Sequence, residues 1–167
     1  TAAVNISDWT TDETNTITIK PPSNIITECN KNQSHSGVFG AGYNIDTSAE
    51  NGTSISIECD NIIIDSIQIK SKNTQNGITI SDNKNNIIIN SIIKNGNDGI
   101  KYFGANDKRN IIINNIIYNC SNSGITPMQN WVLYNNTVAY CIGGIGVYNA
   151  NLATVINTIC YGNAVDF

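Results

Sequence analysis

The chain has 167 residues, a net charge of −4 at pH 7 and a pI near 4.7, and only 13% of its residues are charged. This length suits one domain with a buried core, so we expect residues 1–167 to form a single unit. The acidic balance disfavours nucleic acid and anionic membrane surfaces as partners, because both attract basic proteins. We also expect no membrane span, since no run of about 18 apolar residues occurs.

The first fifty residues show little regularity. The segments Ile17–Ile19 and Ser36–Phe39 resemble short strands, and Pro21–Pro22 marks a turn between them. We therefore expect residues 1–50 to form about two irregular coils of a repeating fold. His35 is the only histidine and has no acidic partner nearby in sequence, which favours a turn or surface position without a catalytic role.

Residues 51–167 contain two interleaved repeats with a period of 20 to 25 residues. The first repeat is a glycine followed by apolar, polar and apolar residues, and its glycines are Gly77, Gly99, Gly124 and Gly144. The second is an isoleucine-rich run that ends in an acidic or amide residue, and these residues are Asp65, Asn90, Asn114 and Asn135. Two interleaved series with one period indicate a single structural unit repeated.

Short β-branched runs bounded by Asn, Gly and Ser favour strands over helices. A unit of 20 to 25 residues without a helix cannot pair its short strands locally, so each strand must pair with its equivalent in the next coil. We therefore predict an all-β fold, a right-handed parallel β-helix of about seven coils. The Asp and Asn positions would lie at a sharp bend with left-handed φ, where stacked amides form a ladder.

The glycine and isoleucine rungs of residues 51–167 resemble those of the pectate-lyase-like superfamily of right-handed parallel β-helices. The segment 8–19 is similar to the openings of large bacterial or viral β-helix surface proteins. The superfamily includes lyases, hydrolases, epimerases, tailspikes and adhesins, so the resemblance implies a fold without fixing a function. It implies an extracellular location, or one on a cell or virion surface.

A lyase interpretation centres on Lys101. In the superfamily's polysaccharide lyases, aspartates hold Ca²⁺ beside the sugar carboxylate and a Lys or Arg acts as base. The resemblance would therefore imply that Lys101 is the base and that Asp98 and Asp107 are the calcium ligands. A lysine base requires a depressed pKa, and calcium requires several clustered carboxylates. One lysine with scattered aspartates favours instead a solvated Lys–Asp rim, with no catalytic residue, metal or cofactor.

Cysteines and aromatic residues give weaker indications. The odd number of cysteines, five, leaves at least one thiol free, and Cys120 and Cys141 are predicted to stack as buried thiols in successive coils. Aromatic residues accumulate late in the chain. Trp131 and Tyr134 are candidates for stacking on sugar rings, with packing in the core as the alternative.

The segment Ala164–Phe167 matches a strand in the middle of a rung, which would leave an apolar edge open. We expect either further chain or a second subunit on this edge. The leading hypothesis is a non-enzymatic surface module, part of a fibre, filament or adhesin, that contacts polysaccharide. The alternatives are a polysaccharide lyase that uses Lys101 and Ca²⁺, and a passive glycan-binding module.

Overall fold

The structure is a computed structural model that describes residues 4–29, 31–104, 108–144, 146–148 and 153–167. These residues form strands of two to four residues joined by turns, and no helix occurs among them. The all-β prediction is therefore confirmed. Within the same residues there is also no helix long and apolar enough to cross a membrane.

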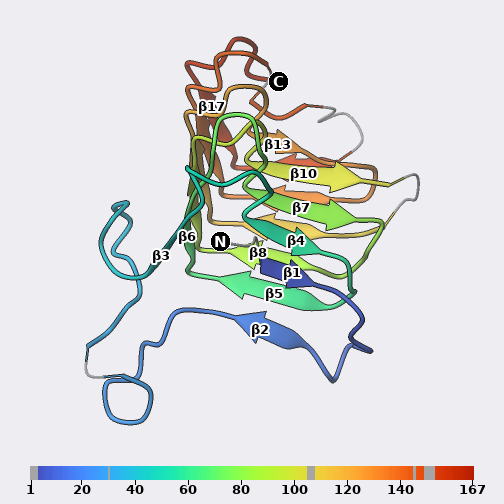
Figure 1. Cartoon of the computed structure of the whole chain (residues 1–167). Coiled ribbons are helices and arrows are strands. Elements are labelled where there is room, and N and C mark those ends of the chain that lie inside the picture. The colour runs from blue at the N-terminus through green and yellow to red at the C-terminus, as the bar shows by residue number, and fades with distance from the viewer. Residues whose placement is uncertain (1–3, 30, 105–107, 145, 149–152) are drawn as a thin grey trace.

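In the described part of the chain, seventeen strands form three parallel sheets that run along the stack (Figure 1). The first sheet contains β1 (Val4–Ile6), β4 (Ile55–Ile57), β7 (Ile78–Ser81), β10 (Ile100–Phe103) and β13 (Ile125–Thr126). The second contains β2 (Ile17–Ile19), β5 (Ile62–Asp65), β8 (Ile87–Ile89), β11 (Ile111–Ile113), β14 (Val132–Tyr134) and β16 (Thr154–Ile156). The third contains β3 (Asn44–Asp46), β6 (Gln68–Lys70), β9 (Ile92–Lys94), β12 (Ile116–Tyr118), β15 (Thr137–Ala139) and β17 (Ile159–Tyr161). Each strand pairs with its equivalent one coil away, which defines a parallel β-helix.

The number of coils is smaller than predicted. Over the residues that the structure describes, the sheets contain five, six and six strands, so the solenoid makes five to six coils there instead of seven. The error lies in the first fifty residues, which supply the single coil β1–β2–β3. Residues 20–29 and 31–43, called the arm below, leave the stack after β2 and return at β3 (Figure 1, lower left). The segment Ser36–Phe39 belongs to this arm and forms no strand, whereas Ile17–Ile19 is confirmed as β2.

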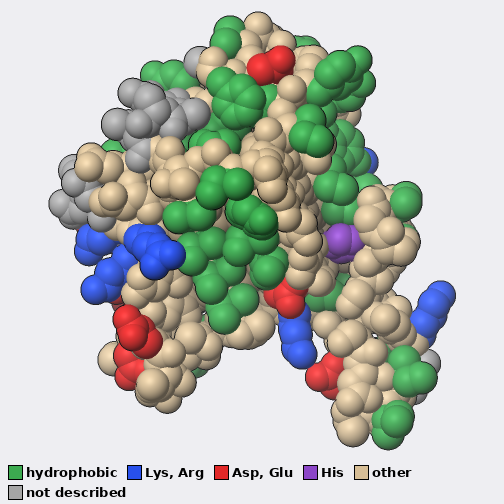
Figure 2. Space-filling view, turned by 180° about the vertical axis from the view of Figure 1, so that it is seen from behind, with side chains coloured by type: hydrophobic (Ala, Val, Ile, Leu, Met, Phe, Trp, Pro, Cys, Tyr) green, Lys and Arg blue, Asp and Glu red, His purple; other side chains and the backbone are tan. Residues whose placement is uncertain are grey.

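The core is a column of aliphatic side chains from all three sheets. In β11 the middle residue, Ile112, is fully buried, whereas Ile111 and Ile113 point outward and are half-buried. The same alternation in neighbouring strands places apolar residues on the outer surface of the second sheet. They form the isoleucine face: Ile63, Ile87, Ile89, Ile111, Ile113, Val132, Tyr134 and Ile156. Figure 2 shows hydrophobic side chains gathered at the centre of the face seen from behind.

The bend between the second and third sheets carries the predicted left-handed residues. Asn90, Asn114 and Asn135 have φ values of 52°, 60° and 54°. One coil earlier, Ser66 takes this conformation with φ of 57°, because β5 and β8 pair so that Asp65 lies opposite Ile89. The assignment of Asp65 to the bend position was therefore wrong by one residue.

An amide ladder forms at this bend as predicted, over part of its length. Asn90 Nδ2 donates to Asp65 Oδ1 at 3.1 Å, and Asn114 Nδ2 donates to Asn90 Oδ1 at 3.2 Å. A second, buried ladder of Ser91, Asn115 and Asn136 lies one residue further along each coil. The two ladders supply hydrogen bonds between coils at the bend, which lies between the second and third sheets.

The glycines that precede strands of the first sheet lie where a side chain has no room. A Cβ on Gly99 would lie 2.4 Å from Ile117 Cγ2 and 2.6 Å from the Gly124 carbonyl oxygen. Gly77, Gly99 and Gly124 follow the predicted series, but its next member is Gly146, whose carbonyl accepts from the Ile125 N–H at 2.9 Å. Gly144 lies instead in the preceding turn, because Val147 pairs with Ile125.

Candidate functional site

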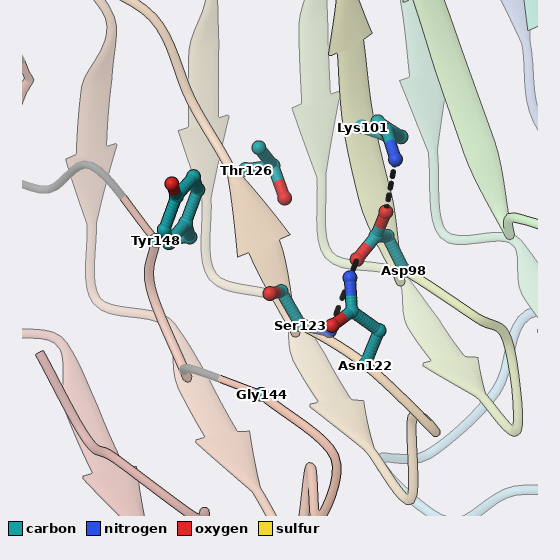
Figure 3. Close-up of a pocket in the computed structure, with 7 residues that line it drawn as sticks. All are labelled: Asp98, Lys101, Asn122, Ser123, Thr126, Gly144 and Tyr148. Atoms are coloured by element: carbon teal, nitrogen blue, oxygen red, sulfur yellow. Dashed lines mark hydrogen bonds and ion pairs between the residues drawn. The ribbon is translucent and has the colours of Figure 1, made fainter.

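A cavity of about 310 Å³ opens on the outer surface of the first sheet (Figure 3). Lys101 on β10 lies in register between Thr79 on β7 and Thr126 on β13, as the repeat predicted. The lining residues are Asp98, Lys101, Asn122, Ser123, Thr126, Gly144 and Tyr148. Lys101 and Thr126, each the polar residue of its glycine repeat, therefore line one concave surface.

Asp98 is the most constrained group of this cavity. Its Oδ1 accepts hydrogen bonds from Asn122 Nδ2 at 2.7 Å and from the Ser123 N–H at 3.0 Å. Its Oδ2 lies 2.8 Å from Lys101 Nζ, in an ion pair whose side chains are 0% and 27% exposed for Asp98 and Lys101. The prediction that Asp98 belongs to a solvated rim is therefore wrong. Its carboxylate is buried and joins two coils.

Lys101 is placed as a hydrogen-bond donor. A lysine acts as a base through a neutral amine with a free lone pair, and the Asp98 carboxylate binds the protonated form. The ammonium also lies 5.1 Å from the centroid of the Phe103 ring. Thr126 and the exposed Tyr148 add hydroxyl groups to the same surface. This arrangement suits binding of a hydroxylated or acidic ligand better than proton abstraction.

The residues around Asp98 do not suit Ca²⁺. Calcium requires several oxygen ligands, and the groups that contact Asp98 are N–H donors and an ammonium, which repel a cation. Asp107, the second predicted ligand, lies outside the described residues. Among the residues that the structure describes, no three His, Cys, Asp or Glu side chains are grouped to hold a metal ion.

The two aromatic candidates have different environments. Trp131 is 0% exposed and packs edge-on against Tyr102, with ring centroids 5.8 Å apart. Trp131 is therefore a core residue, which corrects its assignment as a sugar-stacking residue. Tyr134 is 38% exposed and belongs to the isoleucine face. Of the two side chains, only that of Tyr134 is exposed enough to contact a sugar.

A second cavity, of about 330 Å³, lies between the arm and the bend of the second and third sheets. On the arm side, His35 Nε2 donates to the Asn90 carbonyl oxygen at 2.6 Å, while its Nδ1 accepts from the Gly37 N–H at 3.1 Å. Figure 2 shows the histidine at the junction of the arm and the solenoid. The sequence pattern does not reveal this groove, because the contact between His35 and Asn90 joins residues 55 positions apart and follows no repeat.

The stacked thiols are found as predicted. Cys120 and Cys141 are free and buried. The neighbouring Cys141 thiol, together with burial, raises the pKa of Cys120 well above its usual range, and the neighbouring Cys120 thiol lowers the pKa of Cys141. Their position inside the stack gives them a packing role.

No protein-family model matches the chain, and neither a curated protein nor a solved structure is significantly similar to it. Its function is therefore argued from the fold and from the geometry of the two cavities.

Proposed function

We propose that the chain is a non-enzymatic structural module outside the cell or on a cell or virion surface, part of a fibre, filament or adhesin. The observation that carries the proposal is the buried position of Asp98. Its carboxylate is committed to Asn122, Ser123 and Lys101, so this charged cluster joins two coils. A catalytic carboxylate would face the cavity with a free oxygen.

The pectate-lyase-like superfamily is the proposed origin of this fold. Parallel pairing in three sheets, an amide ladder at one bend and glycines that precede the strands support that kinship. Solenoids of this kind serve as stiff shafts, because each coil is bonded to its neighbours along the entire axis.

Polysaccharide is the proposed partner of the first-sheet cavity. The Lys101 ammonium donates hydrogen bonds, and the Thr126 hydroxyl both donates and accepts them. The Tyr148 ring adds an apolar surface. This combination matches the hydroxyl groups and apolar ring faces of a sugar.

Self-association is proposed for the last coil. Ile156, Ile159 and Tyr161 on β16 and β17 are 43%, 61% and 62% exposed. Side chains of this kind gain free energy when an apolar surface covers them. Sedimentation of the purified chain tests self-association: we expect a concentration-dependent increase in mass, and a monomer at micromolar concentration would contradict it.

The alternative function is a polysaccharide lyase, and one observation favours it: Lys101 lines a cavity together with Thr126 and Tyr148. Incubation with polygalacturonate or alginate and Ca²⁺, followed by the absorbance of unsaturated products, separates the two functions. We expect no turnover. Turnover that is lost in Lys101→Ala but kept in the matched control Lys84→Ala, on an exposed turn, would replace the structural proposal.

A further inference from the structure

We propose that the groove between the arm and the solenoid bend binds an uncharged oligosaccharide that lies along the stacking axis. The proposal goes beyond the function above, which places no ligand in this groove. Three successive coils form the floor of the groove, and each coil contributes one asparagine at the bend and one outward residue of the third sheet. The floor residues are Asn90, Asn114, Asn135, Ile92, Ile116 and Thr137.

The arm is a fixed wall of this groove. Gln68 on β6 is 0% exposed, and its side chain accepts from the Gly40 N–H at 2.6 Å and donates to the Ala41 and Tyr43 carbonyl oxygens at 2.6 and 3.1 Å. Further along the arm, Lys94 Nζ lies 3.9 Å from the centroid of the Phe39 ring. A buried glutamine that donates two hydrogen bonds to the arm and accepts one from it holds the wall in one place.

The charge of the lining selects the class of ligand. None of the residues that line the groove is Asp, Glu, Lys or Arg. His35 is held by one donated and one accepted hydrogen bond, the arrangement of a neutral ring. A phosphate, a uronate or a cation would lose its hydration without gaining an opposite charge. The groove therefore favours a neutral, polar molecule.

The backbone of the floor is not available to a ligand. The N–H groups of Ile92, Ile116 and Thr137 donate to carbonyl oxygens of the preceding coils at 2.9, 2.9 and 2.8 Å. An extended peptide binds a sheet through free backbone groups at its edge, and the floor offers none. Recognition must come from side chains.

The side chains that remain free match a sugar. Within the described residues, the Asn135 amide and the Thr137 hydroxyl make no side-chain hydrogen bond, and the groove is open to solvent beside them. Both groups donate and accept, as sugar hydroxyls do. The half-buried Ile116 between them and His35 offers an apolar strip for a ring face. The volume of about 330 Å³ lies at the small end of the range for ligand sites, about 300–1,000 Å³, which suits a short stretch of chain.

The test is calorimetric titration of the purified chain with hexasaccharides of β-1,4-glucose, β-1,3-glucose, α-1,4-glucose and β-1,4-mannose, and with an oligogalacturonate of similar length. We expect at least one neutral series to bind with Kd below about 1 mM. Asn135→Gly, which tolerates the φ of 54°, and Thr137→Val should each weaken that binding about tenfold or more. Thr154→Val, at an exposed position on β16 outside both cavities, is the matched control and should leave it unchanged.

A spectroscopic measurement on the unaltered chain guards against variants that fail to fold. The ring signals of His35, the only histidine, should shift on addition of the sugar that binds. The proposal is overturned if no neutral hexasaccharide binds at about 10 mM, if only the oligogalacturonate binds, or if Thr126→Val, in the first-sheet cavity, abolishes binding while Asn135→Gly does not. Absence of binding here leaves the outcome of the polyuronate assay untouched, so failure of one proposal is distinguishable from failure of the other.

Discussion

Asn115 and Asn136 are stacked in adjacent coils, and two hydrogen bonds join them at a single oxygen. The Asn115 backbone N–H and its Nδ2 donate to Oδ1 of Asn136 at 3.0 and 3.1 Å. The Asn115 Oδ1 in turn accepts from the Ser91 N–H at 2.9 Å. Each amide thus satisfies backbone groups at a bend, where the sheets supply no partner.

Replacement of Asn115 by Ala should destabilise the whole solenoid. The substitution removes donors to the Ile88 and Ile113 carbonyl oxygens and the acceptor of the Ser91 N–H, all of them inside the fold. Unsatisfied buried groups cost about 1–3 kcal/mol each, so we expect the free energy of unfolding to fall by about 3 kcal/mol in a urea titration. The exposed Asn73→Ala is the control and should change it by less than about 0.5 kcal/mol. Equal effects of the two substitutions would contradict a structural ladder.

The buried ion pair predicts an order of stabilities. Lys101→Ala leaves the fully buried Asp98 carboxylate without its cation and should cost about 3 kcal/mol, measured by chemical denaturation. Asp98→Asn keeps an oxygen for Asn122 and Ser123 and frees the partly exposed Lys101 to reach water, so it should cost less. The double variant should be more stable than Lys101→Ala alone. The reverse order would mean that Asp98 is solvated in solution.

Local repeats predicted the sheets, because their signal lies within a few residues of each strand. Isoleucine runs bounded by Asn and Ser predicted β8 (Ile87–Ile89) and β11 (Ile111–Ile113), and the glycine repeat predicted the strand β10 that carries Lys101. The register between coils was less predictable where turn lengths differ. The turn from Cys141 to Gly146 is one residue longer than the turn from Cys120 to Gly124, and the glycine of the series is Gly146 instead of Gly144.

Long-range contacts were beyond prediction from the pattern. The arm is held by Gln68 and His35 through bonds that join residues 28 and 55 positions apart. His35 lies outside the repeat, and Gln68 takes a position where the next coil has Ile92. Trp131 precedes β14 at a place where earlier coils have Asn110 and Asn86, so its burial could not be inferred from an aliphatic series. The first cavity was partly predicted through Lys101 and Asp98, and the groove beside the arm was not.

Acid should weaken the first coil. Hydrogen bonds from Ser48, with a further contribution from Lys70, lower the pKa of Asp46 from 3.8 to about 2. Hydrogen bonds from Thr14 and Asn15 lower the pKa of Asp12 from 3.8 to about 2. Because both folded values lie below the unfolded ones, their contribution is present above pH 3.8 and is lost as the pH falls toward about 2. Thermal unfolding followed across this range should show a falling midpoint, and Asp46→Asn should flatten the fall. A midpoint independent of pH in the unaltered chain would contradict the depressed values.

Thiol reactivity should separate two cysteines of similar exposure. Cys29 and Cys160 are both half-buried, but burial and the nearby Asp166 raise the pKa of Cys160 to about 12. Since the thiolate is the reactive form, we expect Cys29 to react first with a disulfide reagent at neutral pH, and all five thiols to react only after unfolding. Cys29→Ser should remove the fast phase and Cys160→Ser should leave it. A fast phase that survives Cys29→Ser would show that the last coil opens in solution.

The glycine column should tolerate no side chain. A Cβ on Gly99 would meet Ile117 Cγ2 at 2.4 Å and the Gly124 carbonyl oxygen at 2.6 Å, and the second contact is with backbone that cannot rotate away. Overpacking of a close-packed interior costs about 1–3 kcal/mol, so Gly99→Ala should lower the free energy of unfolding by about 2 kcal/mol or more. Thr126→Ala, at an outward position on β13 of the same sheet, should change it by less than about 0.5 kcal/mol. Equal stabilities of Gly99→Ala and Thr126→Ala would contradict this prediction. They would mean that the coils lie further apart at β10 and β13 than in the structure, and that the glycine column from Gly77 to Gly146 has no steric basis.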